Sequence, residues 1–391
     1  MTTSVRRDTR VESSDFVRTG PGTLGGRYLR RFWQPVYVAA DLPSGVAKPI
    51  QILGEKFTLY RGEAGTPHVV AHRCAHRGTQ LSSGWVEDDC IRCLYHGWRY
   101  DASGRCVEQP GEGGEGFAAR VQLAGYPTRE HLGMIFAYFG EGRPPAFPPY
   151  PAFANPALAE IGVLDAWSVL FPCNYFQSYE NTSDEFHVAY VHSGGGTHSG
   201  LAGVPKMFAE ETDDGFVRRS VRVDGRVRVT QHLMPNTTRV IVPPFKGMRG
   251  VGGWRDSYFT LVPIDDESHF MFGMQVAAVS GSEMKQYESV RQQFLAEVAA
   301  SRPPHELAGE VMAGRDRLSN YSEHPYSVNI EDIVAQAGQG TVADRTNERL
   351  GRTDVGVILM RKIWSRELRA LDHGSPLKEW CYRGELPEVG L

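Results

Sequence analysis

Short apolar runs alternate with turn residues along residues 33–140. The runs PVYVA, FTLYRG, HVVAH and MIFAYFG are rich in β-branched and aromatic side chains and are too short for ordinary helices, which is typical of strands. The segment DASG (101–104) lies inside a further β-rich stretch, and its aspartate and glycine suit a hairpin turn. This part of the chain is therefore predicted to be rich in β-structure.

The hydrophobic pattern changes after a proline cluster at residues 142–151, which can continue neither a helix nor a central strand and so indicates a boundary. Residues 215–280 alternate as the strands of an antiparallel sheet with one solvated face. Residues 178–192 have a helical pattern that ends at the glycine-rich SGGG, and residues 283–300 and 354–371 have helical periods.

Together these elements predict an α+β protein of two domains, as the length of 391 residues also suggests. We expect a tail over residues 1–26, a β-rich domain over residues 27–145, and a larger domain over residues 146–391 with an antiparallel sheet flanked by helices. No apolar run is long enough to span a bilayer, and the N-terminal segment lacks the apolar core of a secretion signal. We therefore expect a cytoplasmic protein without membrane contact. The net charge of −4 gives no reason to expect nucleic acid as a partner.

Two cysteines and two histidines form paired motifs in the β-rich domain, Cys74-x-His76 and Cys93-x-x-His96. Thiolate together with imidazole favours zinc or an iron–sulfur cluster. A structural zinc that also uses Cys90 is one alternative, and cysteines without a shared role are another. The preferred hypothesis is a [2Fe–2S] cluster in which two cysteines hold one iron and two histidines hold the other. Two loops that each carry one cysteine and one histidine supply that arrangement.

The motif CxH…CxxHGW resembles the Rieske family, and its oxygenase branch in particular. Rieske proteins of respiratory complexes carry an additional cysteine soon after each motif, whereas Arg-Gly-Thr follows His76 and Gly-Trp-Arg follows His96 here. The resemblance implies a Rieske [2Fe–2S] domain whose reduction potential lies at the low end of the Rieske range. Cys90 and Cys106 are then expected to be free and half-buried.

A second constellation, Asn181-x-x-Asp184-x-x-His187-x4-His192, falls on the predicted helix. The first three side chains are spaced by three residues and would share one helix face. His192 would lie ~140° around an ideal helix from His187, so both can face one metal only if the helix distorts or ends. Two histidines and a carboxylate form the facial triad of non-heme iron(II) oxygenases. A polar helix end with two ordinary histidines is the alternative.

The two motifs in this order are similar to those of Rieske non-heme iron oxygenases. That resemblance implies a catalytic domain of the helix-grip (START-like) type, a mononuclear Fe(II) held by His187 and His192, and a third, carboxylate ligand far downstream. Within IEDIVAQAGQG, Asp332 matches that position and Glu331 is the second choice; weaker candidates are Asp344 and Asp354. An acidic residue near a helix N-terminus is the structural alternative.

The resemblance also implies an assembly. It implies a homotrimer in which Asp184 links His187 to His76 or His96 of the neighbouring subunit, so that electrons cross there. Asn181 would lie near the iron, in a role that stays open. The segment GGGTHSG (194–200) lacks the strand–turn–helix context of a dinucleotide site. We therefore expect electrons from a separate NAD(P)H-dependent reductase, either directly or through a ferredoxin.

The stretches TGPGTLGGRYLRRFWQPVYVA and QAGQGTVADRTNERLGRTDVGV resemble the phthalate-dioxygenase-like branch, whose members act on aromatic acids and methoxy-aromatics. We expect O₂-dependent hydroxylation of a small aromatic substrate. O-demethylation of a methoxy-aromatic acid is the first hypothesis, and cis-dihydroxylation of an aromatic carboxylate is the second. A Rieske electron-transfer protein without oxygenase activity is the alternative from another class. A substrate carboxylate would need an arginine, and the candidates on predicted strands are Arg226, Arg228 and Arg239.

Overall fold

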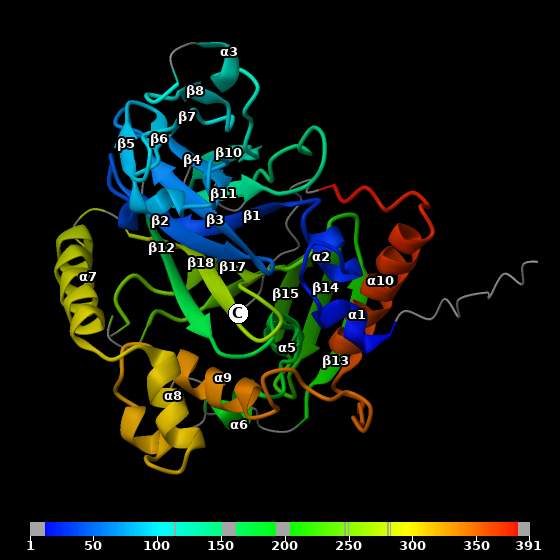
Figure 1. Ribbon diagram of the computed structural model, residues 1–391. Helices are drawn as coiled ribbons and strands as arrows, with labels where there is room; N and C mark the ends of the chain where they lie inside the picture. The colour runs from blue at the N-terminus through cyan, green and yellow to red at the C-terminus, as the bar shows by residue number, and fades with distance from the viewer. Residues whose placement is uncertain are drawn as a thin grey trace, which may run out of the picture.

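The computed structural model describes residues 12–112, 115–150, 162–192, 204–245, 248, 250–279, 281 and 283–381. Figure 1 shows two parts, a smaller group of β-sheets and a larger sheet covered by helices. The predicted α+β class with a β-rich N-terminal domain is confirmed. The predicted helix stop at residues 193–196 and the segment GGGTHSG lie outside the described residues.

The N-terminal part consists of three small antiparallel sheets. The first contains β1 (Trp33–Val38), β11 (Met134–Tyr138) and β10 (Thr128–His131), and the second β2 (Ala47–Ile52), β3 (Glu55–Arg61), β4 (Pro67–Ala71) and β9 (Gly125–Tyr126). The third contains β5 (Trp85–Glu87), β6 (Cys90–Arg92), β7 (Arg99–Tyr100) and β8 (Cys106–Glu108). The DASG hairpin is confirmed between β7 and β8, where Gly104 has a φ of +83° that suits glycine.

The C-terminal part is built on a seven-stranded antiparallel sheet with the order β12-β18-β17-β16-β15-β14-β13. The strands are β12 (Gly162–Phe171), β13 (Lys206–Glu211), β14 (Gly215–Val221), β15 (Val227–Leu233), β16 (Thr237–Val242), β17 (Arg255–Pro263) and β18 (His269–Ala278). The antiparallel sheet predicted over residues 215–280 is confirmed, because β14 to β18 pair in sequence order.

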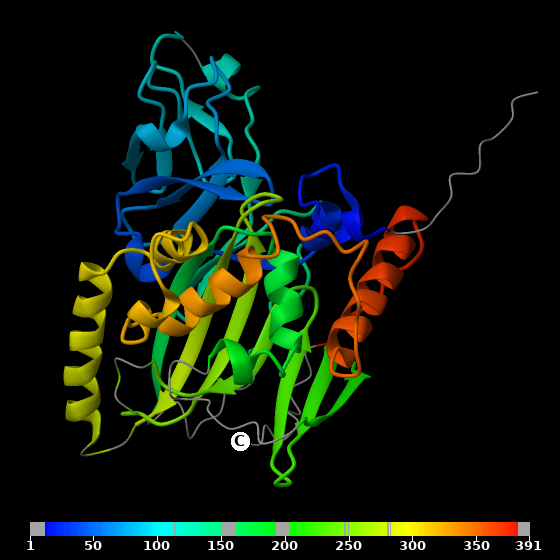
Figure 2. The ribbon, with the colours of Figure 1, turned by 90° about the horizontal axis from the view of Figure 1, so that it is seen from below.

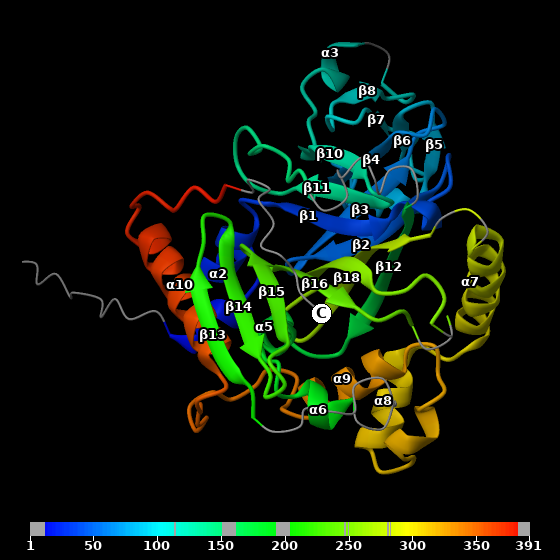
Figure 3. The same cartoon turned by 180° about the vertical axis from the view of Figure 1, so that it is seen from behind.

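Helices cover one face and both edges of this sheet. These helices are α5 (Tyr175–Ser183), α6 (Val188–Val191), α7 (Glu283–Ala300), α8 (Pro304–Met312), α9 (Ser327–Ala337) and α10 (Val355–Asp372), with a short 3₁₀ turn at Leu318–Tyr321. The N-terminal part contains α3 (Glu115–Ala118), which contacts β8, and 3₁₀ turns at Ala39–Asp41 and Leu81–Ser83. In Figure 2, α5 and α9 lie across the face of the sheet. In Figure 3, α10 lies along the β13 edge and α7 beyond the opposite edge. No helix within the described ranges has the length and apolar character needed to cross a membrane.

The tail predicted over residues 1–26 is wrong from residue 12 onward. Residues 12–29 form α1 (Ser13–Val17) and α2 (Leu24–Leu29), which pack on the C-terminal part. The Phe16 ring stacks on Phe176 with centroids 5.1 Å apart, and the Tyr28 ring meets Trp364 at 5.1 Å. Phe16 and Tyr28 are buried, so the apolar surface that they remove from water holds this segment in place.

The continuous helix predicted over residues 178–192 is also wrong. Helix α5 ends at Ser183, and Asp184 has an extended backbone with φ of −93° and ψ of 121°. The Phe186 N–H donates to the Asp184 carboxylate at 2.7 Å, and α6 begins only at Val188. A short acidic side chain that accepts from the backbone two residues ahead competes with helical hydrogen bonding, which explains the break.

Candidate cluster site and candidate metal site

The loops that carry the two Cys–His motifs have the same backbone conformation. In each loop the cysteine N–H donates to the carbonyl of the residue that closes the loop (Cys74 to Thr79, 2.8 Å; Cys93 to Trp98, 2.8 Å). The glycine before that residue donates back to the cysteine carbonyl (Gly78, 2.9 Å; Gly97, 3.0 Å). These glycines have φ values of +76° and +72°, which strain any residue with a Cβ. The sequence therefore folds into two matching loops, one after β4 and one between β6 and β7.

The thiols of these loops lie inside the domain and the imidazoles lie outside it. Cys74 and Cys93 are buried, whereas His76 and His96 are exposed, with ring centroids 4.4 Å apart. The His76 ring stacks on Trp98 at 4.5 Å, which fixes its orientation. Two inner sulfur ligands and two outer nitrogen ligands are the donor set that a Rieske cluster requires.

The polar groups around the sulfurs also fit a cluster. The Tyr100 hydroxyl lies 3.1 Å from the Cys74 sulfur. Burial raises the pKa of the Cys93 thiol, while the N–H groups of Tyr95 and His96 hydrogen-bond to its sulfur and oppose that rise in pKa. Hydrogen bonds to the sulfurs compensate the negative charge of a bound cluster.

The leftover cysteines are free, as expected. Cys106 is more buried than predicted, at 3% exposed, while Cys90 is half-buried. Burial raises the pKa of Cys90, and the charged groups that act on it are Arg99 and three nearby aspartates, not the cysteines of the loops.

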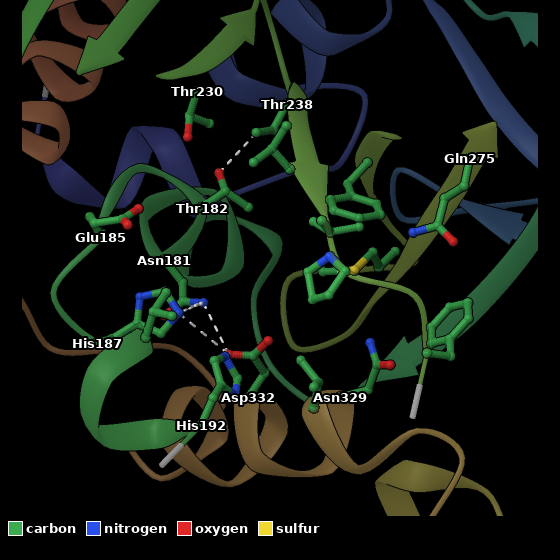
Figure 4. A pocket seen from close by; sticks show the side chains of 18 of the residues that line it. Asn181, Thr182, Glu185, His187, His192, Thr230, Thr238, Gln275, Asn329 and Asp332 are labelled. Carbon is green, nitrogen blue, oxygen red and sulfur yellow. Dashed lines mark hydrogen bonds and ion pairs between the residues drawn. The ribbon is translucent and has the colours of Figure 1, made fainter. Parts of the chain in front are cut away.

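The break between α5 and α6 brings the second set of residues together. His187 and His192 flank α6, and Asp332 projects towards them from α9 (Figure 4). One ligand atom from each of the three residues lies within 4.8 Å of the others. The distances to Asp332 Oδ1 are 3.8 Å from His187 Nε2 and 3.6 Å from His192 Nε2. Bonds of about 2 Å to a divalent metal place two ligands roughly 3–4 Å apart, so these three fit one ion.

Two further predicted residues lie against this group. The Asn181 amide donates to Asp332 Oδ1 at 3.2 Å and lies 3.4 Å from His187 Nε2. Asp184 Oδ2 lies 3.6 Å from His187 Nδ1, on the opposite side of that ring. Burial raises the pKa of Asp184, but the neighbouring His187 ring and the backbone N–H groups of Phe186 and His187 outweigh burial and hold the pKa below its usual value. The carboxylate is therefore ionised at neutral pH.

The other acidic candidates are placed differently. Asp344 is exposed and accepts from Thr346, and Asp354 accepts from the Gly351 N–H, so both stabilise local turns. Glu331 does contact the group, but its Oε2 lies 2.8 Å from His192 Nδ1, behind the ring. Among the acidic candidates from the downstream segment, the carboxylate that faces both histidine Nε2 atoms is that of Asp332.

A cavity of about 180 Å³ adjoins the three residues. Its walls are largely apolar, and the polar groups in it include Thr182, Gln275 and Asn329 (Figure 4). No sequence pattern pointed directly to these wall residues, although the isolated glutamine in the apolar run FMFGMQVAA is unusual for a buried strand. The Gln275 carbonyl accepts from the Trp167 N–H at 3.3 Å. The apolar side chains in its walls include those of Trp167, Val240, Val242, Pro243, Pro244, Phe245, Phe259 and Met271.

Of the three arginines considered from the sequence, the one that lines this cavity is Arg228. Arg226 is exposed and pairs with Asp224, and Arg239 forms two hydrogen bonds with Asp256 at 3.0 and 2.6 Å. These two are therefore engaged elsewhere.

Arg228 belongs to a buried cluster that the sequence did not predict. Glu185 is 1% exposed and lies 3.0 Å from Arg218, 3.7 Å from Arg222 and 3.4 Å from Arg228. Burial raises the pKa of Glu185, but the three arginines outweigh it and hold the pKa below its usual value. The Asp184 carboxylate also acts on Arg218, so the three guanidinium groups outnumber the two nearby carboxylates by one, which favours an anionic ligand beside Arg228.

Comparison with known proteins agrees with this geometry. Residues 32–127 match the Rieske [2Fe-2S] domain. Over 94% of its length the chain is 30% identical to the 5,5'-dehydrodivanillate O-demethylase oxygenase subunit of Sphingobium sp., of which it covers 82%. Over 90% of its length it is 31% identical to the phenoxybenzoate dioxygenase subunit alpha of Ectopseudomonas oleovorans, of which it covers 84%. Its fold is similar to the terminal oxygenase of carbazole 1,9a-dioxygenase from Novosphingobium sp. KA1, with a TM-score of 0.61, 21% identity, and 91% and 96% of the two chains covered.

Proposed function

The chain belongs to the Rieske non-heme iron oxygenases, as the oxygenase component of a multicomponent enzyme, and from that premise we propose that it O-demethylates a methoxy-aromatic acid. The observation that carries the proposal is the aromatic-sized cavity directly beside His187, His192 and Asp332. A cavity of ~150 Å³ with apolar walls holds one benzene molecule, so about 180 Å³ suits one substituted ring.

The cluster would be held by Cys74, His76, Cys93 and His96, and the mononuclear iron by His187, His192 and Asp332. Such an iron supplies O₂ activation when electrons reach it. The methoxy C–H bond gains one oxygen atom, and the other oxygen atom leaves as water with two electrons and two protons. The resulting hemiacetal releases formaldehyde and leaves a phenol.

The side chains of the cavity have separate tasks in this proposal. Arg228, beside the surplus of positive charge around Glu185, would bind the substrate carboxylate. The aromatic and aliphatic walls would hold the ring and exclude water. The Asn181 amide would hold the Asp332 carboxylate in place through its hydrogen bond.

Electrons would come from a separate NAD(P)H-dependent reductase, directly or through a ferredoxin. Figure 1 shows the β5–β8 sheet, whose β6 and β7 flank the Cys93 loop, on the opposite side of the molecule from α6 and α9. This separation supports a homotrimer in which a neighbouring subunit supplies the cluster nearest to each iron. Asp184, behind the His187 ring, is the residue we propose to receive those electrons from His76 or His96 of the neighbour.

The test combines the Fe(II)-loaded protein with a reductase, NADH and 3- or 4-methoxybenzoate, and measures O₂, formaldehyde and the aromatic product. One formaldehyde and one hydroxybenzoate per NADH is the expected result. A dihydrodiol without formaldehyde would replace O-demethylation by cis-dihydroxylation, the second hypothesis. A protein that is reduced and reoxidised without changing any aromatic acid would contradict the oxygenase assignment and favour an electron carrier. His187→Ala, which leaves the cluster loops untouched, is the control that should abolish product.

A further inference from the structure

Glu331 and Asp332 follow one another on α9 but face opposite nitrogens of the same ring. Glu331 Oε2 lies 2.8 Å from His192 Nδ1, and Asp332 Oδ1 lies 3.6 Å from His192 Nε2. Successive residues of an α-helix project about 100° apart, so α9 can place one carboxylate behind the His192 ring and one in front of it.

The contact behind the ring is short and shielded from water. The side chains of His192 and Glu331 are 6% and 7% exposed. A hydrogen bond to a buried carboxylate is among the stronger ones in proteins. Because a carboxylate accepts, Nδ1 must carry the proton, and the lone pair of His192 then sits on Nε2, facing Asp332.

His187 has a weaker support of the same kind. Its Nδ1 lies 3.6 Å from Asp184 Oδ2, beyond ordinary hydrogen-bond reach, and the Asp184 side chain is 27% exposed. The two histidines therefore differ. His192 is held by a short contact in the interior, whereas the partner of His187 is partly open to solvent.

We infer that Glu331 is a positioning residue for the metal site: it fixes the tautomer and ring orientation of His192 and so sets the affinity of the site for its ion. This rests on the proposed iron site and adds a residue that would not itself be a ligand. Groups that hold a ligand histidine from behind typically change metal affinity by about 10- to 100-fold when removed.

The experiment measures metal affinity rather than turnover. Mononuclear iron is removed from the cluster-containing protein, and Co²⁺ or Fe²⁺ is titrated back without oxygen into the wild type, Glu331→Leu and Glu331→Gln. Gln keeps an acceptor oxygen at the same reach, whereas Leu removes it. Glu367→Leu is the matched control, because Glu367 is equally buried on α10 and pairs with Arg366 instead of a histidine. The visible spectrum of the cluster reports the fold of each variant.

We expect Glu331→Leu to weaken binding by about 10- to 100-fold, Glu331→Gln to recover part of that loss, and Glu367→Leu to leave affinity unchanged. Wild-type affinity in Glu331→Leu would overturn the role of Glu331. Equal losses in Glu331→Leu and Glu367→Leu would overturn it too, because a general effect on the fold would then explain both. A wild-type protein that binds no ion beyond its cluster iron would instead show that the proposed metal site is wrong.

Discussion

Arg228 offers a direct test of substrate binding. Its side chain is only 16% exposed, it lines the cavity, and it lies 3.4 Å from Glu185. Arg228→Met keeps most of the apolar stem and removes the guanidinium. The variant removes one of the three positive charges around Glu185, and it removes the predicted partner of the substrate carboxylate.

The expected loss follows from the strength of one shielded hydrogen bond to a charged group. Such bonds contribute about 1.5–3 kcal/mol, which corresponds to roughly a 10- to 150-fold fall in kcat/KM at 1.36 kcal/mol per tenfold change. Because the carboxylate is bound equally in the ground and transition states, most of the loss should appear in KM and little in kcat.

The assay compares a methoxybenzoate with its neutral carboxamide in the wild type and in Arg228→Met. The wild type should prefer the acid, and the variant should lose that preference while it keeps its activity on the amide. Arg226→Met is the matched control, since Arg226 precedes the same strand but is exposed and paired with Asp224. An equal loss on acid and amide, or the same loss in Arg226→Met, would refute a specific role for Arg228.

Three other predictions concern the centres and the core. Asp184→Asn should keep its cluster and mononuclear iron yet lose about 10- to 100-fold in turnover and in substrate-dependent cluster oxidation, and wild-type rates with intact metal would contradict the electron path. Tyr100→Phe should lower the cluster potential by about 40 mV in a redox titration, because the lost hydrogen bond to the Cys74 sulfur is worth ~1 kcal/mol; an unchanged potential would contradict this. Burial lowers the pKa of His269 from 6.5 to about 4, although its hydrogen bond to the Cys173 carbonyl opposes this. As the pH falls below 6.5, His269 is protonated in the unfolded state before it is protonated in the folded state. The free energy of unfolding is therefore unaffected by this residue above pH 6.5 and falls by about 3 kcal/mol as the pH drops to 4. Urea unfolding at pH 7 and pH 4.5 should show a smaller pH dependence for His269→Asn, and an equal dependence would count against the assignment.

The regular parts of the fold could be predicted from the sequence because their polar and apolar residues follow a local period. The alternation over residues 215–280 corresponds to strands β14–β18, although β17 and β18 are buried along almost their whole length, so the expected solvated face is not observed there. The helical periods over residues 283–300 and 354–371 correspond to α7 and α10. The segment at residues 12–29 could not be predicted in this way. This segment has few apolar residues, and they are buried by contact with Phe176 and Trp364, which are distant in the sequence.

The residues of the candidate site were likewise predictable only where a local pattern places them. The spacing of each Cys–His motif places its cysteine and histidine on one short loop, but the two loops follow β4 and β6 of different sheets and are brought together by the tertiary fold. The choice between Glu331 and Asp332 depends on the rotation of α9, which no local pattern reveals. Arg226 and Arg228 are two residues apart, so a strand pattern places both on the same face of the sheet. They differ because β15 begins at Val227, which leaves Arg226 exposed in the preceding turn and places Arg228 within the strand, at the cavity.

The cluster environment was also only partly predictable. The absence of an additional cysteine after each motif suggested a potential at the low end of the Rieske range. The hydroxyl of Tyr100 at the Cys74 sulfur acts in the opposite direction, because a donor to the sulfur stabilises the reduced cluster. The potential is still a prediction, and its value will depend on the balance of these two effects.

The most direct test of the whole account is a count of iron, zinc and acid-labile sulfide per chain, before and after Fe²⁺ is added without oxygen. A Rieske cluster with a mononuclear site predicts about three irons and two sulfides after addition, and no zinc. About two irons and two sulfides that do not increase with added Fe²⁺ would leave an electron carrier without an oxygenase site. Zinc without sulfide would contradict the account at its first step, the ligands of the two Cys–His loops.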